Sequence, residues 1–167
     1  MNVKTSKKLT IIALSILVLS TAFVLALLFM GTLSNSVKTS NDMNEGIAIG
    51  CTGAVLVVVF LFALIVKAIS IIFGVSSLFV KRKLASILVL GVLTCVLAVV
   101  SLICSTYCVI IFQGVQNGSS SASLMNAGLI MALVSDALWL GSIIFNTATI
   151  SKSVKATNAE ELLKSEE

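Results

Sequence analysis

Residues 84–112 read LASILVLGVLTCVLAVVSLICSTYCVIIF, a stretch of 29 residues without a charged side chain. A helix rises about 1.5 Å per residue, so about 20 apolar residues cross the hydrocarbon core of a bilayer. Membrane strands are about ten residues long and alternate polar with apolar side chains, which this stretch does not do. The stretch therefore predicts a membrane-spanning helix.

Three further runs, at residues 9–33, 47–80 and 124–150, have the same character and pass the same length test. Together the four runs predict an all-α integral membrane protein built as a four-helix bundle. We expect helices at about 9–33, 47–80, 84–112 and 124–150 in a bundle of residues 9–150. A short N-terminal segment, 1–8, and a tail, 151–167, flank this bundle.

The composition supports a lipid environment for most of the chain. Hydrophobic residues make up 58% of the 167 positions, charged residues 11%, and the mean hydropathy is +1.15. A soluble domain needs about a quarter charged residues to solvate its surface. The chain also lacks histidine, which excludes a His-ligated metal site and a His general base. We expect no cofactor.

Basic residues gather in three places that predict the orientation. They are Lys4, Lys7 and Lys8 before the first run, Lys81, Arg82 and Lys83 before the third, and Lys152 and Lys155 after the fourth. Because short cytoplasmic loops carry the excess of Lys and Arg, both termini should be cytoplasmic. The compact loops favour a bacterial plasma membrane, with an organelle membrane as the alternative. Topology control accounts for these clusters, so no nucleic-acid partner is expected.

The second run, 47–80, is too long for one ordinary span. Its 34 residues would reach about 51 Å as a helix, which a typical tilt of about 20° cannot absorb. We expect the helix to project towards the cytoplasm. The alternative is a break near Lys67, with the remainder lying along the interface, since Lys67, Ser70 and Gly74 recur at helical spacing on one stripe.

Small residues at steps of three and four predict where helices pack closely. We expect Gly46, Gly50 and Gly53 on the second helix, Gly91 and Ala98 on the third, and Gly128 and Ala132 on the fourth to mark these faces. The favoured interpretation is packing inside the bundle. The alternative is that one stripe forms a face for another protein chain.

Among the polar side chains within the apolar runs, three are candidate intramembrane sites: Lys67, Asp136 and Asn146. Asp136 lies about 18 Å from the outer start of its run, where an acidic group is costly. It is either a proton or cation relay, or a structural group bonded to neighbouring helices. For Lys67 we expect snorkelling to the cytoplasmic interface. If its helix begins nearer Gly53, however, Lys67 could approach Asp136.

No catalytic constellation is present, so we expect no enzyme. The four cysteines all lie within predicted helices and should act as small apolar groups. The leading hypothesis is a non-catalytic protein that acts through helix association, as a subunit, scaffold, accessory or immunity-type factor. Its partners would be membrane lipids and either further copies, in a homo-oligomer, or another membrane protein. The alternative is a small oligomeric transporter or channel subunit that uses Asp136, and a lipid-organising protein is a third possibility.

Overall fold

The structure, a computed structural model, describes residues 3–30, 37, 43–79 and 84–165. This part of the chain is helical almost throughout. Its helices are α1 (Val3–Phe29), α3 (Met43–Phe79), α4 (Leu84–Val115) and α5 (Ser120–Ser165). Each contains a stretch long and apolar enough to cross a membrane. The predicted all-helical fold with four such helices is therefore confirmed.

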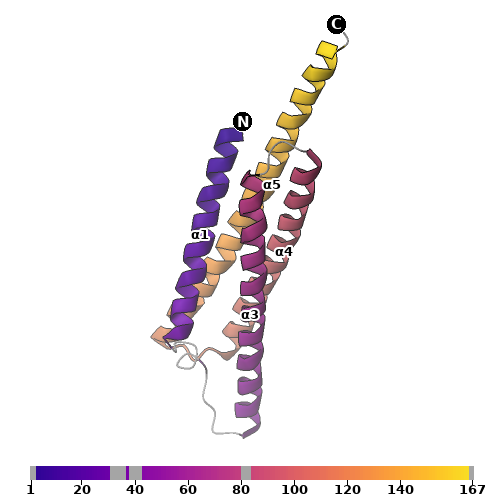
Figure 1. Cartoon of the computed structure of the whole chain (residues 1–167). Helices are drawn as coiled ribbons and strands as arrows, with labels where there is room; N and C mark the ends of the chain where they lie inside the picture. The colour runs from indigo at the N-terminus through magenta and orange to yellow at the C-terminus, as the bar shows by residue number, and fades with distance from the viewer. Residues whose placement is uncertain (1–2, 31–36, 38–42, 80–83, 166–167) are drawn as a thin grey trace.

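The four helices run up and down alongside one another (Figure 1). The start of α1, the end of α3, the start of α4 and the end of α5 lie at one end of the bundle, here called the terminal end; the other is the far end. α3 packs against α4, α4 against α5 and α5 against α1, whereas α1 and α3 scarcely touch. The two parallel helices α3 and α5 therefore face each other across the bundle.

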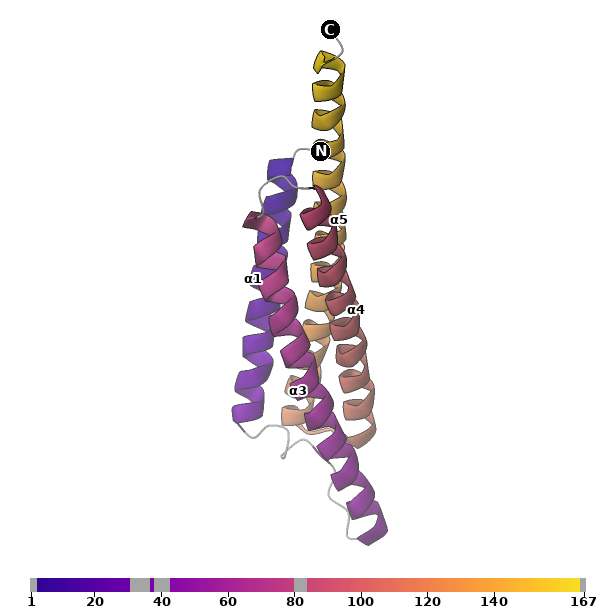
Figure 2. The same cartoon turned by 45° about the vertical axis from the view of Figure 1, so that its right-hand side comes forward.

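Helix lengths differ from the sequence expectations in two ways. α3 continues through Lys67 to Phe79, so the predicted alternative of a break near Lys67 is wrong. Its excess length projects beyond the other helices at the far end (Figure 2), and not at the terminal end that the basic clusters assign to the cytoplasm. The helix that projects at the terminal end is α5, which continues to Ser165 through most of the expected tail.

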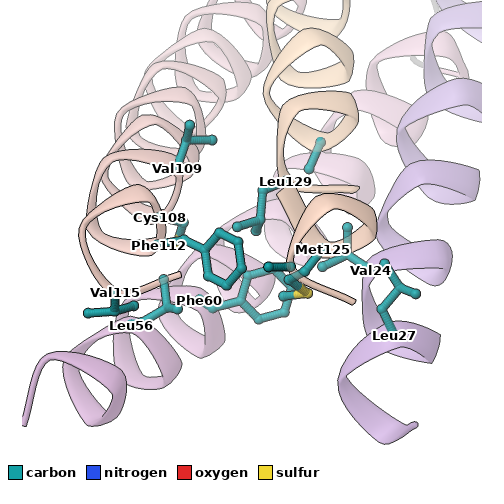
Figure 3. Packing of buried hydrophobic residues seen from close by; sticks show 12 residues of the cluster. Val24, Leu27, Leu56, Phe60, Cys108, Val109, Phe112, Val115, Met125 and Leu129 are labelled. Carbon is teal, nitrogen blue, oxygen red and sulfur yellow. The ribbon is translucent and has the colours of Figure 1, made fainter. Parts of the chain in front are cut away.

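Apolar side chains fill the far half of the bundle (Figure 3). The rings of Phe60 and Phe112 lie beside Met125 and Leu129, and Val24 contributes to the same cluster from α1. A second, smaller cluster lies nearer the terminal end. Its buried members are Ala13, Leu17, Ala98, Trp139 and Ile143. The interior between these clusters holds the polar side chains described below.

The connection between α4 and α5 is a tight, capped turn. Gly118 has a φ of +74°, a left-handed conformation that costs glycine little. The Ser119 hydroxyl then accepts the backbone N–H of Ala122 at 3.2 Å, which caps the start of α5. Both α4 and α5 extend further towards this turn than the apolar runs predicted.

Candidate functional site

A buried ion pair lies at the centre of the bundle. Nζ of Lys67 on α3 is 3.1 Å from Oδ2 of Asp136 on α5, and the two side chains are 4% and 1% exposed. From α4, the hydroxyl of Ser101 donates to Oδ1 at 3.2 Å and that of Ser105 donates to Oδ2 at 2.5 Å. One carboxylate therefore joins three helices.

This pairing corrects the expectation that Lys67 snorkels to the interface. Lys67 is 3% exposed and contacts Asp136, the approach that the sequence left open, although α3 begins at Met43 and not near Gly53. An unpaired charge at the bilayer centre costs about 2.5–3.5 kcal/mol on insertion scales. Snorkelling would remove the burial cost of the ammonium group alone, whereas pairing lowers the burial cost of the ammonium and of the carboxylate together. The sequence contained both charges but could not set their relative depth.

A second polar contact between α3 and α5 lies one turn from the ion pair. Nε1 of Trp139 donates to the hydroxyl of Ser70 at 3.0 Å. Beside it, a Cβ added to Gly74 would lie 2.4 Å from Cζ2 of Trp139, so only glycine leaves room for the indole. Lys67, Ser70 and Gly74 form the stripe noted in the sequence, and this stripe faces α5. Its helical spacing was visible in advance, but the role of Trp139 was not.

Hydroxyl groups extend the polar contacts to α1. The hydroxyls of Ser20 on α1 and Ser135 on α5 are 2.7 Å apart in the interior. Asn146, the third polar residue singled out from the sequence, is 2% exposed and lies further along α5 towards the terminal end. Polar contacts therefore tie α5 to each of the other three helices, and α5 is the organising helix of the bundle.

The small residues predicted for helix packing divide into two groups. Gly91, Ala98, Gly128 and Ala132 are all buried. Gly91 lets α4 approach α5 closely, because an added Cβ would lie 2.5 Å from Cγ2 of Thr147. These residues lie where internal packing of the bundle requires them.

The small residues of the early part of α3 lie elsewhere. Gly50 is exposed, Gly46 and Gly53 are half-buried, and a Cβ added to Gly50 or Gly53 would meet no atom within 4 Å. Their expected role in packing inside the bundle is therefore not seen for these two glycines. This part of α3 extends past the neighbouring helices (Figure 2).

The remaining predicted residues add no reactive group. Lys81, Arg82 and Lys83 lie outside the described residues. All four cysteines are free thiols, and only Cys51 is exposed. Within the described ranges, no three His, Cys, Asp or Glu side chains come together as metal ligands would. Both oxygens of Asp136 are occupied by side chains, so this arrangement is suited to anchoring helices.

Three comparisons with known proteins find no counterpart. No family model, curated protein or solved structure matches the chain. The function must therefore be argued from the geometry.

Proposed function

We propose that this chain is a non-catalytic membrane protein that acts by associating with a transmembrane helix of another chain. It would serve as a subunit, scaffold, accessory or immunity-type factor in a bacterial plasma membrane. The observation that carries the proposal is the projecting segment at the start of α3, which extends past the other helices (Figure 2). We define it as residues 43–55, which precede Leu56, the first buried residue of the helix.

The surface of the projecting segment suits close contact with a helix. Gly46, Gly50 and Gly53 follow one another at steps of four and three, which keeps them on one face. Small residues on such a face let two helix backbones approach closely. Apolar Ile47 and Val55 flank the glycines and are 56% and 50% exposed. The segment thus has a face of small residues and an exposed apolar surface that do not pack inside the bundle.

The surroundings of Asp136 favour association over transport. Transport through Asp136 would need a carboxylate that can exchange its partners with a passing ion or proton. In the structure its oxygens contact Lys67, Ser101 and Ser105, and apolar side chains fill the far half of the interior. Ion flux in liposomes that is lost on Asp136→Asn would restore the transporter hypothesis.

The test compares Gly50→Ile with Gly114→Ile. Both glycines are exposed, and at both an added Cβ would meet nothing within 4 Å, so neither change should disturb the bundle. The native thiol of Cys51, next to Gly50 and exposed, serves as the crosslinking probe. Oxidation in native membranes should link Cys51 by a disulfide to a second copy or to a partner. The Cys51→Ser variant is the negative control.

We expect the wild-type chain and Gly114→Ile to form the crosslinked species and to migrate as an assembly in mild detergent. Gly50→Ile should lose both properties while keeping its helical circular dichroism, because the bulky side chain holds the partner helix away. A wild-type protein that stays monomeric, and from which no crosslinked partner is recovered, would overturn the proposal.

A further inference from the structure

The ion pair occupies different positions along the helices that it joins. In α5 the apolar span is Ser120–Lys152, and Asp136 lies at its midpoint. In α4 the span is Val89–Val115, and Ser101 and Ser105 lie close to the middle. In α3, however, the span is Met43–Ser76, and Lys67 lies far towards its C-terminal end.

This asymmetry can be expressed as a displacement. From Lys67, α3 carries about 36 Å of apolar helix towards the far end but only about 14 Å towards the terminal end, at 1.5 Å per residue. Centring its span on the level of Asp136 would require a slide of about 11 Å, or two helical turns. The pair thus holds α3 away from the depth at which its apolar length would match the bilayer.

We infer that the Lys67–Asp136 pair holds α3 in the register of the structure, here called the outward register, in which its projecting segment lies beyond the far end of the bundle. When the pair is broken, α3 slides towards the terminal end and draws the projecting segment into the lipid. Two forces act in that direction: the long apolar span moves towards the centre of the bilayer, and the free ammonium of Lys67 moves towards water. Helices that pack through repeated small steps can shift by whole turns, as packed elements do in other switches.

The inference shares with the proposed function the four membrane spans and the projecting segment, but it needs no partner chain. It predicts how the depth of two positions changes. In the outward register Cys51 lies about 24 Å from the level of the pair, beyond a half-thickness of about 15 Å. Ser76 lies on the opposite side at about 14 Å, at the edge of the hydrocarbon. A slide of about 11 Å would bring Cys51 to about 13 Å, just inside the edge of the hydrocarbon, and Ser76 to about 25 Å, into water.

The experiment measures labelling by a membrane-impermeant maleimide supplied on both faces of proteoliposomes. The first probe is native Cys51, and the second is Ser76→Cys in a Cys51→Ser background. The Ser123→Cys variant in the same background serves as a stationary reference on α5, where Ser123 is exposed. The labelling rate of each probe is measured with the pair intact, with Asp136→Asn and with Lys67→Met. The Lys67→Met change removes a charge from α3 and so favours insertion of that helix into the lipid.

We expect both pair-breaking changes to slow labelling of Cys51 by about tenfold or more, because a thiol in lipid does not form the reactive thiolate. Labelling at Ser76→Cys should rise, and Ser123→Cys should not change. The Ser105→Ala variant, which keeps the ion pair, should label like the wild type. Unchanged labelling of Cys51 in both pair-breaking variants would overturn the inference. So would a rise at all three probes, because that pattern reports general loosening of the bundle.

Discussion

The energetic coupling of Lys67 and Asp136 can be measured with three variants: Lys67→Met, Asp136→Leu and the double change. In the register of the structure, Asp136→Leu leaves the ammonium of Lys67 buried without its counter-ion and removes the acceptor of Ser101 and Ser105. A slide of α3 would relieve part of that cost. Removing one partner of a buried pair costs about 3–5 kcal/mol. Lys67→Met leaves the carboxylate with both serine hydroxyls, so we expect a smaller loss of about 2–3 kcal/mol, near the insertion cost of one charge.

The double variant buries no charge, and apolar replacement of both partners is often close to neutral. The serine hydroxyls can then turn to carbonyl oxygens of their own helix, as the Thr94 and Thr106 hydroxyls already do. We therefore expect it to lose no more than about 1–2 kcal/mol, which gives a coupling energy of several kcal/mol between the two sites.

The assay is reversible unfolding in mixed micelles, followed by the fluorescence of Trp139. Trp139 is the only tryptophan of the chain and is 1% exposed, so its emission reports the packing between α3 and α5. Helical circular dichroism gives an independent transition. If the costs of the two single changes simply add in the double variant, the pair makes no net contribution and the reasoning is refuted.

Two further predictions concern close approaches at glycine. Gly74→Ala should destabilise the bundle by about 1–3 kcal/mol and shift the Trp139 emission to the red, because the new methyl group would overlap the indole ring. Gly141→Ala is the matched control in the same unfolding assay: nothing lies within 4 Å of its added Cβ, and alanine favours a helix by up to about 1 kcal/mol. Gly91→Ala should cost about 1–3 kcal/mol through its overlap with Thr147, and Thr147→Ala in the same chain should recover most of that loss. A Gly91→Ala variant as stable as the wild type would contradict the close α4–α5 contact.

The faces of α4 and α5 illustrate how much of the interior could be predicted. On α4, Gly91 and Ala98 lie in the stripe of small residues read from the sequence, and both are buried. On α5, Gly128 and Ala132 behave in the same way. These packing faces could be predicted because small and hydroxyl side chains recur there at helical spacing, whereas leucine, isoleucine and valine occupy most other positions.

The stripe on α3 shows where such reasoning fails. Gly50 and Gly53 have the same small size and spacing, yet a Cβ added at either would meet no atom within 4 Å. Spacing along a helix specifies a face but not a depth. Depth depends on contacts between residues far apart in the chain, such as Lys67 and Asp136, which are 69 positions apart.

The amino-acid order alone determined that this chain forms long apolar helices, because each helix satisfies its backbone hydrogen bonds within its own segment. It also marked which helix faces are small enough to meet. Only the tertiary structure decided that α5 joins the other three helices, that Lys67 reaches Asp136, and that the spare length of α3 lies at the far end. In lipid no hydrophobic force sorts one apolar helix against another, so these choices depend on particular contacts between side chains distant in the chain.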